Sequence, residues 1–408
     1  MSIGGLILSV RPASIYRQDE SWDGIFADIN YYGSDDIEAI KDSEVEYSVE
    51  KYDMKIDLNN QLEVYGHLKL TSPEARDEFV LTLYHGYKIK KLASKDMEVS
   101  YIRDTDKLIL KFPEKITDCD IEIEYAGYSG KYYSNAQAVM LPGYFPWYPM
   151  AGDRQIFVQY PYYSGGNGYN PYNRIEKADI ILEIDAACNI VTNLNEKTKN
   201  TYAGTSDSIS IIGGNIEKTE DTLFINILPL ELNGENESEY IETLREKWNH
   251  ILTKLDKVFG IDTESLRNKK LIMVSKDMGR NFSNNYFVEF DDYILYSVEY
   301  LDSSTYMNYI LQQKGKDSKI GDLFSKAIIL SEEISAEELI KHMIEEEAEY
   351  NQMMQMIEET EESEISGKLK TAVDKIGAEQ VVRSIVQYLL DPVMTSDDDF
   401  WMMIESIE

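Results

Sequence analysis

The stretch Leu62-Glu-Val-Tyr-Gly-His-Leu-Lys-Leu70 alternates apolar and polar side chains along its length. Successive side chains of a strand point to opposite faces of a sheet, so this pattern predicts a strand with one buried and one solvated face. Short runs of the same kind, separated by turn-forming residues, occur on both sides of it. They are Val45–Val49, Val80–Tyr84, Leu108–Phe112, Ile121–Tyr125, Ala178–Ile184 and Thr222–Leu228. Such runs favour an antiparallel β-sandwich over residues 45–231.

The pattern becomes helical after residue 232. Apolar residues from Leu244 to Phe259 recur at the spacing of one helix face, and Gly260 ends the run. Two strand-like segments follow, and helices dominate from about Thr305 onward. Ser335-Ala-Glu-Glu338 has the spacing of a capping box that opens a long helix. The sequence therefore predicts three parts: an acidic leader (1–44), the β-sandwich (45–231) and a mainly α-helical domain (232–408).

Charge and composition narrow the class of partner. The chain has 408 residues, and its 40 basic and 74 acidic side chains give a formal charge of −34. A surface of this sign repels phosphate backbones and anionic lipid, so nucleic acid is not an expected partner. A cationic peptide or a basic protein surface fits better. The 43% of hydrophobic residues indicate folded domains rather than a disordered chain.

Cysteine and histidine are too sparse for a disulfide framework or a usual zinc site. Cys119 and Cys188 are predicted to be two buried free thiols, although a single bridge between them stays possible. The four histidines lie far apart, so the usual zinc-ligand spacings are missing. The sequence predicts no cofactor and no bound metal.

No segment has the length of a bilayer-spanning helix. The apolar start, Ile3–Val10, is much shorter than the ~20 residues that a span needs, and it lacks the features of a signal peptide. The chain is therefore expected to be either a cytoplasmic protein or an extracytoplasmic domain of a larger membrane protein.

Two further stretches have an unusual composition. Tyr160–Tyr172 is rich in Tyr, Gly and Pro, and it is either a ligand-binding loop or, more simply, a long loop covered by its own tyrosines. Residues 331–366 contain thirteen Glu and one Lys, which favours a solvated helix face over a cation site. Ser396-Asp-Asp-Asp399 matches a calcium loop in composition only.

One segment carries a family resemblance. Val139-Met-Leu-Pro-Gly-Tyr-Phe-Pro-Trp-Tyr-Pro149 resembles a segment late in the N-terminal domain of the aminopeptidase N family of zinc peptidases. With its Leu-Pro-Gly and Trp-Tyr-Pro runs, it also resembles the peptidase-like extracytoplasmic domains of bacterial ABC transporter permeases. The resemblance extends loosely over residues 45–408. It implies that the helical domain is a degenerate, thermolysin-like peptidase domain.

The resemblance also locates the positions of the family's zinc site. The best match to its H-E-x-x-H motif places Met307 and Leu311 where the family has histidines, and Asn308 where it has the catalytic glutamate. The third metal ligand would correspond to Glu345, and the glutamate of the family's Gly-x-Met-Glu-Asn strand to Glu289. A thioether, an amide and an isobutyl group cannot assemble a hydrolytic zinc centre. Zinc peptidase activity is therefore not expected.

These observations predict a non-catalytic binding or sensing domain, part of a membrane transporter. Its groove would be acidic and lined by Tyr162, Tyr163 and Tyr169, with Glu289 nearby. It would accept a peptide or protein ligand, and a cationic one would suit the acidic lining. Two alternatives stay open. One is a hydrolase that uses a pair of carboxylates without histidine, and the other is a structural spacer without a ligand.

Overall fold

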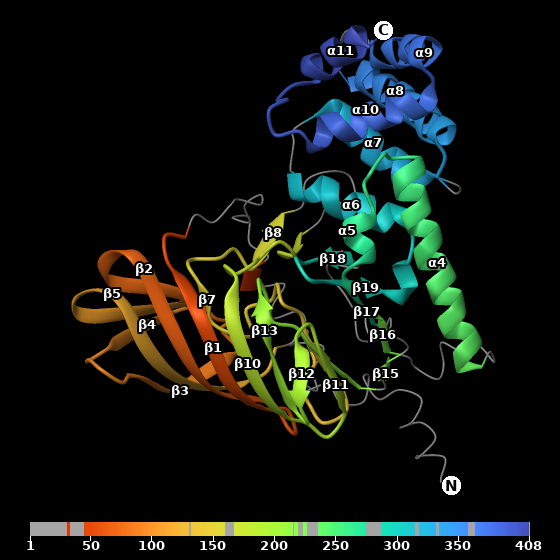
Figure 1. Cartoon of the computed structure of the whole chain (residues 1–408). Helices are drawn as coiled ribbons and strands as arrows, with labels where there is room; N and C mark the ends of the chain where they lie inside the picture. Colours follow the sequence, from red (N-terminus) through yellow and green to blue (C-terminus); the bar gives the residue numbers. More distant parts are fainter. Residues whose placement is uncertain are drawn as a thin grey trace. The chain divides into compact units, whose positions relative to one another are not determined.

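The computed structural model describes most of the chain and divides it into two compact units. The described residues are 31–32, 45–129, 132–159, 167–214, 216–218, 223–226, 236–274, 287–314, 318–331, 334–357 and 364–407. The first unit comprises residues 1–158, 168–241 and 269–299, and the second comprises 159–167, 242–268 and 300–408. The first is rich in strands and the second in helices (Figure 1).

A large sheet forms the main body of the first unit (Figure 1). Its strand order is β12-β13-β10-β1-β2-β5-β3, and β4 pairs with β5 while β7 pairs with β2. The bounds are β1 Ser48–Asp57, β2 Leu62–Thr82, β3 Tyr87–Ser94, β4 Ser100–Asp104, β5 Lys107–Gly127, β7 Met150–Ala151, β10 Ala178–Asp185, β12 Asn195–Thr198 and β13 Thr201–Ser206. The pairing is mostly antiparallel, as predicted, but β1 and β10 run parallel.

The predicted alternation in β2 is confirmed. Leu62, Val64, Leu68 and Leu70 are buried, whereas the charged residues between them lie on the opposite, solvated face. Burial of such a face removes apolar surface from water, which stabilises the sheet by about 25 cal/mol per Å². The hydrophobic side of the sheet is thus fixed by the period of the sequence.

A second, three-stranded sheet has the order β11-β14-β6, formed by Asn189–Thr192, Ile211–Gly214 and Val139–Leu141. The segment after β6, which contains the Trp-Tyr-Pro run, is buried throughout. Tyr52 of β1 and Tyr125 of β5 donate hydrogen bonds to the carbonyls of Pro149 and Trp147, at 2.9 and 3.0 Å. This run therefore anchors the large sheet to the rest of the unit.

A third sheet crosses the boundary predicted at residue 232. Its order is β15-β16-β17-β19-β18, formed by Ile216–Lys218, Leu223–Asn226, Lys270–Val274, Tyr293–Ser297 and Phe287–Glu289. The run Thr222–Leu228, predicted as a strand of the sandwich, instead contributes β16, which pairs in parallel with β17. The segment 269–299 consequently belongs to the first unit, because its strands share hydrogen bonds with residues from before the predicted boundary.

The described helices include those predicted from periodicity. Their bounds are α4 Glu237–Lys257, α5 Glu264–Arg267, α6 Ser303–Lys314, α7 Lys319–Leu330, α8 Ala336–Ile357, α9 Ile365–Ile376, α10 Ala378–Leu390 and α11 Asp397–Ser406, with a short 3-10 turn at Val298–Tyr300. Gly260, with a φ of 69°, follows α4 in the left-handed conformation that ends helices, as predicted. Ser335 accepts a hydrogen bond from the Glu338 amide at the start of α8. Among the described residues, no helix combines the length and hydropathy needed to cross a membrane.

Three smaller features also differ from, or refine, the sequence expectations. Ser396 and Asp399 form a capping box that begins α11, which explains the acidic composition of that segment. Cys119 and Cys188 are both free thiols, but Cys188 is only partly buried. Burial raises the pKa of the Cys119 thiol to about 12, so this thiol is protonated at neutral pH. In the predicted leader, Tyr32 donates a hydrogen bond to Asp106 and stacks on Phe157, so this residue packs against strands of the first unit.

Candidate ligand-binding site

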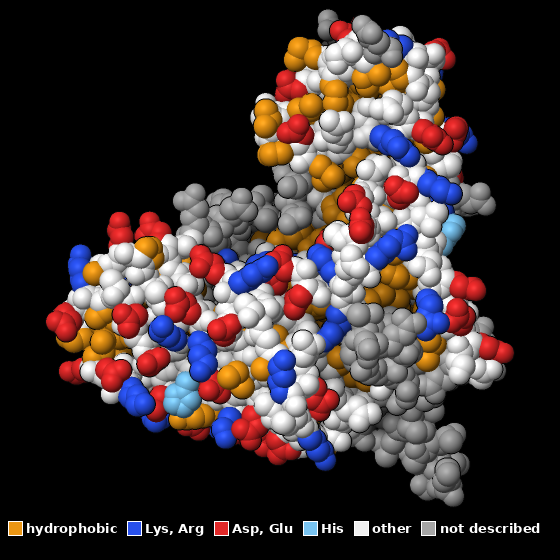
Figure 2. Space-filling view, viewed as in Figure 1, with side chains coloured by type: hydrophobic (Ala, Val, Ile, Leu, Met, Phe, Trp, Pro, Cys, Tyr) orange, Lys and Arg blue, Asp and Glu red, His pale blue; other side chains and the backbone are white. Residues whose placement is uncertain are grey.

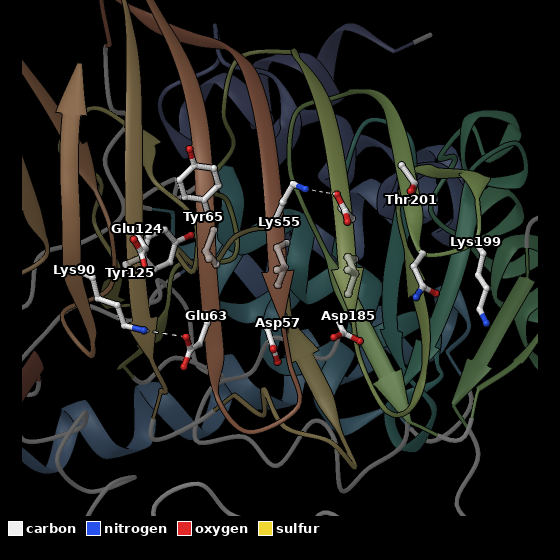
Figure 3. Close-up of a pocket in the computed structure, with 15 residues that line it drawn as sticks. Lys55, Asp57, Glu63, Tyr65, Lys90, Glu124, Tyr125, Asp185, Lys199 and Thr201 are labelled. Atoms are coloured by element: carbon white, nitrogen blue, oxygen red, sulfur yellow. Dashed lines mark hydrogen bonds and ion pairs between the residues drawn. The ribbon is translucent and has the colours of Figure 1, made fainter. Parts of the chain in front are cut away.

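A cavity of about 520 Å³ lies on the solvated face of the large sheet (Figure 3). Adjacent strands β5, β2, β1 and β10 contribute its floor, and β3 and the turn between β12 and β13 contribute its ends. Its charged and aromatic lining consists of Lys55, Asp57, Glu63, Tyr65, Lys90, Glu124, Tyr125, Glu183, Asp185 and Lys199. A volume of this size falls in the range of small-ligand sites.

Strand register arranges these side chains in two rows. Asp57 of β1 lies opposite Glu63 of the antiparallel β2 and opposite Asp185 of the parallel β10, so three carboxylates form one row across three strands. The neighbouring row places Lys55 between Tyr65 and Glu183. Figure 3 shows the carboxylates of Glu63, Asp57 and Asp185 at one level of the cavity.

Two lysines of the cavity already have ion-pair partners. The Nζ of Lys90 is 2.9 Å from Glu63, and the Nζ of Lys55 is 3.0 Å from Glu183. Hydrogen bonds from Gln61 and then Lys90 lower the pKa of Glu63, and the hydrogen bond to Glu183 raises the pKa of Lys55. These side chains are largely exposed, so each pair contributes little to stability.

The three carboxylates that have no lysine partner in the described part of the chain give the cavity its capacity to bind a cation. Asp57, Asp185 and Glu124 have no cationic side chain within ion-pair distance among the described residues, and Asp57 accepts only the amide of Asn59, at 2.8 Å. Like charges directly opposite one another on a sheet are unfavourable. A bound cation would offset this repulsion, so the arrangement is suited to an ammonium or guanidinium group. Within the described residues, no three His, Cys, Asp or Glu side chains are arranged to hold a metal ion.

The structure places the predicted zinc-site positions on two helices, in different environments. Met307 and Leu311 lie one turn apart on α6 and are 0% and 1% exposed. The Oδ1 of Asn308 is buried without a hydrogen-bond partner in the described part of the chain. Glu345 lies on α8, half exposed, where it contacts His342 at 3.3 Å and Lys341 at 3.7 Å. Its carboxylate thus pairs with residues of its own helix.

The predicted groove residues have different environments. Tyr169 is 3% exposed and packs against the rings of Tyr132, Phe145 and Phe157. Tyr162 and Tyr163 lie outside the described residues. The Glu289 carboxylate is 2.6 Å from the Nζ of Lys269.

A buried polar network joins residues 192–210 to the third sheet within the first unit. The Tyr293 hydroxyl of β19 lies 3.2 Å from the Ser208 hydroxyl and contacts that of Ser210, and the Lys270 Nζ donates to the carbonyls of residues 192–194. Burial raises the pKa of both Asp207 and Asp292. These are the type of carboxylates that a hydrolase would use, but Asp207 accepts from Ser208 and lies 3.6 Å from Arg174, and Asp292 accepts from Ser206. The Ser206–Asp292 hydrogen bond connects the end of β13 to the residue that precedes β19.

Sequence reasoning did not single out the three carboxylates of the cavity. One local pattern could have pointed to them. A charged residue followed by Ile and Asp occurs twice, at Lys55-Ile-Asp57 and at Glu183-Ile-Asp185. Its meaning depends on the parallel pairing of two strands that are more than one hundred residues apart, and alternation alone does not reveal that pairing.

No protein-family model and no curated protein matches the sequence. Similar solved structures include an M1 zinc metallopeptidase from Deinococcus radiodurans, with 12% identity over 85% of this chain and 88% of the other and a TM-score of 0.38. A mutant of that enzyme bound to a Tyr-Ser-Ala substrate has 12% identity over 84% and 87% of the chains and a TM-score of 0.39. Yeast LTA4 hydrolase in complex with bestatin has 11% identity over 92% and 67% of the chains and a TM-score of 0.45.

Proposed function

We propose that this protein is a non-catalytic binding domain that accepts a cationic group of a peptide or protein in the sheet-face cavity. The observation that carries the proposal is the in-register row of Glu63, Asp57 and Asp185, of which only Glu63 has a lysine partner among the described residues. The row supplies negative charge at fixed spacing, and Tyr65 beside it supplies an aromatic face for a cation. The cavity favours this function over that of a ligand-free spacer.

Titration with a lysine-rich peptide tests the proposal. We expect the peptide to bind at low salt and to bind several-fold more weakly at high salt, because the contacts are exposed and therefore screened. A neutral peptide of equal length should bind much more weakly. Asp185→Asn should weaken binding of the lysine-rich peptide about 3- to 10-fold, the effect of removing one exposed charge contact. Isothermal titration calorimetry measures all of these affinities.

The matched control is Asp179→Asn, on the same strand. Asp179 is exposed, lies outside the cavity lining and accepts a hydrogen bond from Thr205. Both substitutions remove one negative charge, so a difference between them reports the site rather than the net charge. Equal affinity for both peptides, or equal losses from the two variants, would refute the proposed site.

The non-catalytic part of the proposal rests on Met307 and Leu311. Both side chains are buried apolar groups at the positions where the peptidase resemblance places zinc-binding histidines. We expect purified protein to hold less than stoichiometric zinc and to hydrolyse fluorogenic aminoacyl substrates no faster than buffer. Elemental analysis and a fluorescence assay on the same sample measure this. Stoichiometric zinc accompanied by turnover would overturn the non-catalytic assignment.

We further propose that the domain lies on the extracytoplasmic face of the cell membrane as part of a transporter. Support comes from the Leu-Pro-Gly and Trp-Tyr-Pro runs of residues 141–149, which resemble those of ABC transporter permease domains. Protease added to intact cells should then cleave the native protein. Protection until the cells are lysed would instead indicate a cytoplasmic location.

A further inference from the structure

One edge of the large sheet is formed by two strands that expose different kinds of side chain. The strands β3 and β4 both pair with β5, β3 with its C-terminal half and β4 with its N-terminal end, so together they form one edge of the sheet (Figure 1). Exposed edge strands offer unpaired backbone N–H and C=O groups to other chains, and soluble proteins usually protect them with charged side chains, Lys above all.

Two edge strands of this sheet follow that rule. β3 exposes Lys88, Lys90 and Lys91 along its eight residues. β12, at the opposite edge, has only four residues, all exposed, and includes Glu196 and Lys197. Figure 2 shows the same mixture of Lys and Arg with Asp and Glu over the visible face of this unit.

β4 carries the charged residues Arg103 and Asp104 but, unlike β3 and β12, also exposes large apolar side chains. Tyr101 is 40% exposed and Ile102 is 50% exposed. Successive strand residues point to opposite faces, so apolar side chains are exposed on both faces of the same edge strand. Within the described residues, β4 pairs with β5 alone. An exposed apolar edge of this kind is a template for strand addition.

We propose that β4 is the edge along which a second copy of this chain pairs, as an antiparallel strand related by a twofold axis through Ile102. The sequence Ser100-Tyr-Ile-Arg-Asp104 is self-complementary in that register. Ile102 lies opposite Ile102 of the second copy, Tyr101 lies opposite Arg103, and Ser100 lies opposite Asp104. The pairing therefore combines an apolar contact at Ile102 with a hydroxyl beside a carboxylate at each end, while the Arg103 guanidinium stays on the Leu83 carbonyl of its own chain.

Local charge permits this contact despite the formal charge of −34 on each chain. Arg103 and Asp104 give β4 itself no net charge, and charges more than about 8 Å away are screened at physiological ionic strength. Added salt should therefore increase the dimer population by reducing long-range repulsion. A strand of five residues makes a small interface, so the dimer should form only at high protein concentration.

Sedimentation velocity over a wide concentration series tests the inference. Wild-type protein should shift from monomer towards dimer as concentration rises, and Ile102→Lys should remain monomeric throughout. Ile181→Lys is the matched control, because Ile181 is also exposed, at 36%, but lies on β10 inside the sheet. Wild-type protein that stays monomeric, or an Ile102→Lys variant that dimerises like wild type, would overturn the inference.

Cross-linking tests the register. In a Cys188→Ser background, Ile102→Cys should form a disulfide-linked dimer under mild oxidation, because residue 102 faces its own copy across the axis; Cys119 is buried. Lys111→Cys, at an exposed position on β5, should not cross-link. Equal cross-linking of both variants would contradict the twofold register. None of these outcomes depends on the cation-binding function proposed above.

Discussion

Glu347→Ala is expected to destabilise the helical unit by about 1–3 kcal/mol, the usual cost of leaving buried hydrogen-bond donors without an acceptor. Glu347 is 0% exposed, although it lies in the Glu-rich helix α8. One of its oxygens, Oε1, accepts the amide of Ile365 at 3.2 Å, and the other accepts the amide and hydroxyl of Ser366. The Nζ of Lys319 is 3.8 Å from the same carboxylate.

These contacts satisfy the first amides of α9, which have no partner within their own helix. The residue before α9, Glu364, makes no capping hydrogen bond with its side chain, so Glu347 of α8 caps the neighbouring helix instead. In Glu347→Ala those donors become unpaired beside the site of the lost carboxylate. Urea unfolding followed by circular dichroism at 222 nm measures the loss.

Glu345→Ala is the matched control for this prediction, because Glu345 lies on the same helix but is half exposed. It should change the free energy of unfolding by less than about 1 kcal/mol. Glu347→Gln, which keeps an acceptor oxygen but loses the charge, should lie between the two alanine variants. Similar small effects for Glu345→Ala and Glu347→Ala would show that Glu347 does not cap α9.

Trp147→Ala is expected to destabilise the first unit by about 3–5 kcal/mol, the range for truncation of a large aromatic core residue. Trp147 is 0% exposed, and its Nε1 donates to the carbonyl of Ile209 at 2.9 Å. Its own carbonyl accepts the Tyr125 hydroxyl of β5. Loss of the ring leaves a cavity in the core and an unpaired carbonyl at Ile209.

Hydrogen exchange locates this effect. Amides of β1 and β5 should lose protection in Trp147→Ala, because Tyr52 and Tyr125 hold these strands to the segment that contains Trp147. Trp147→Phe retains most of the volume and removes the donor, so it should cost about 1–3 kcal/mol, the penalty of an unsatisfied buried carbonyl. If the amides of β1 and β5 are as well protected in Trp147→Ala as in the wild type, this anchoring role is excluded.

The sequence predicted those elements whose signal is local. The alternation of Leu62–Leu70 predicted which face of β2 is buried, and the spacing from Leu244 to Phe259 predicted the buried face of α4. Ser335 and Gly260 marked helix ends because capping depends on residues within one turn. Each of these signals needs only a few neighbouring residues.

The candidate site was not predictable in the same way. Asp57 and Asp185 become neighbours only because β1 and β10 pair in parallel, and strand pairing over such a separation leaves no mark in either strand alone. The Tyr-rich loop attracted attention through its composition, yet Tyr169 lies buried in an aromatic cluster. Residue composition indicates which functional groups the chain contains. Only the tertiary structure shows which of them lie close together.

The sequence by itself determined the strand and helix periods, the strongly acidic character and the missing H-E-x-x-H motif, because these are properties of residues and their near neighbours. Tertiary structure alone decided that Glu347 is a buried cap among solvated glutamates, that the strand Leu223–Asn226 belongs to the third sheet, and that three carboxylates share one row. The physical reason is that the burial of a residue and the register of a strand depend on which distant segment packs beside it. That packing is decided by the free energy of the whole core, to which contacts from all parts of the chain contribute.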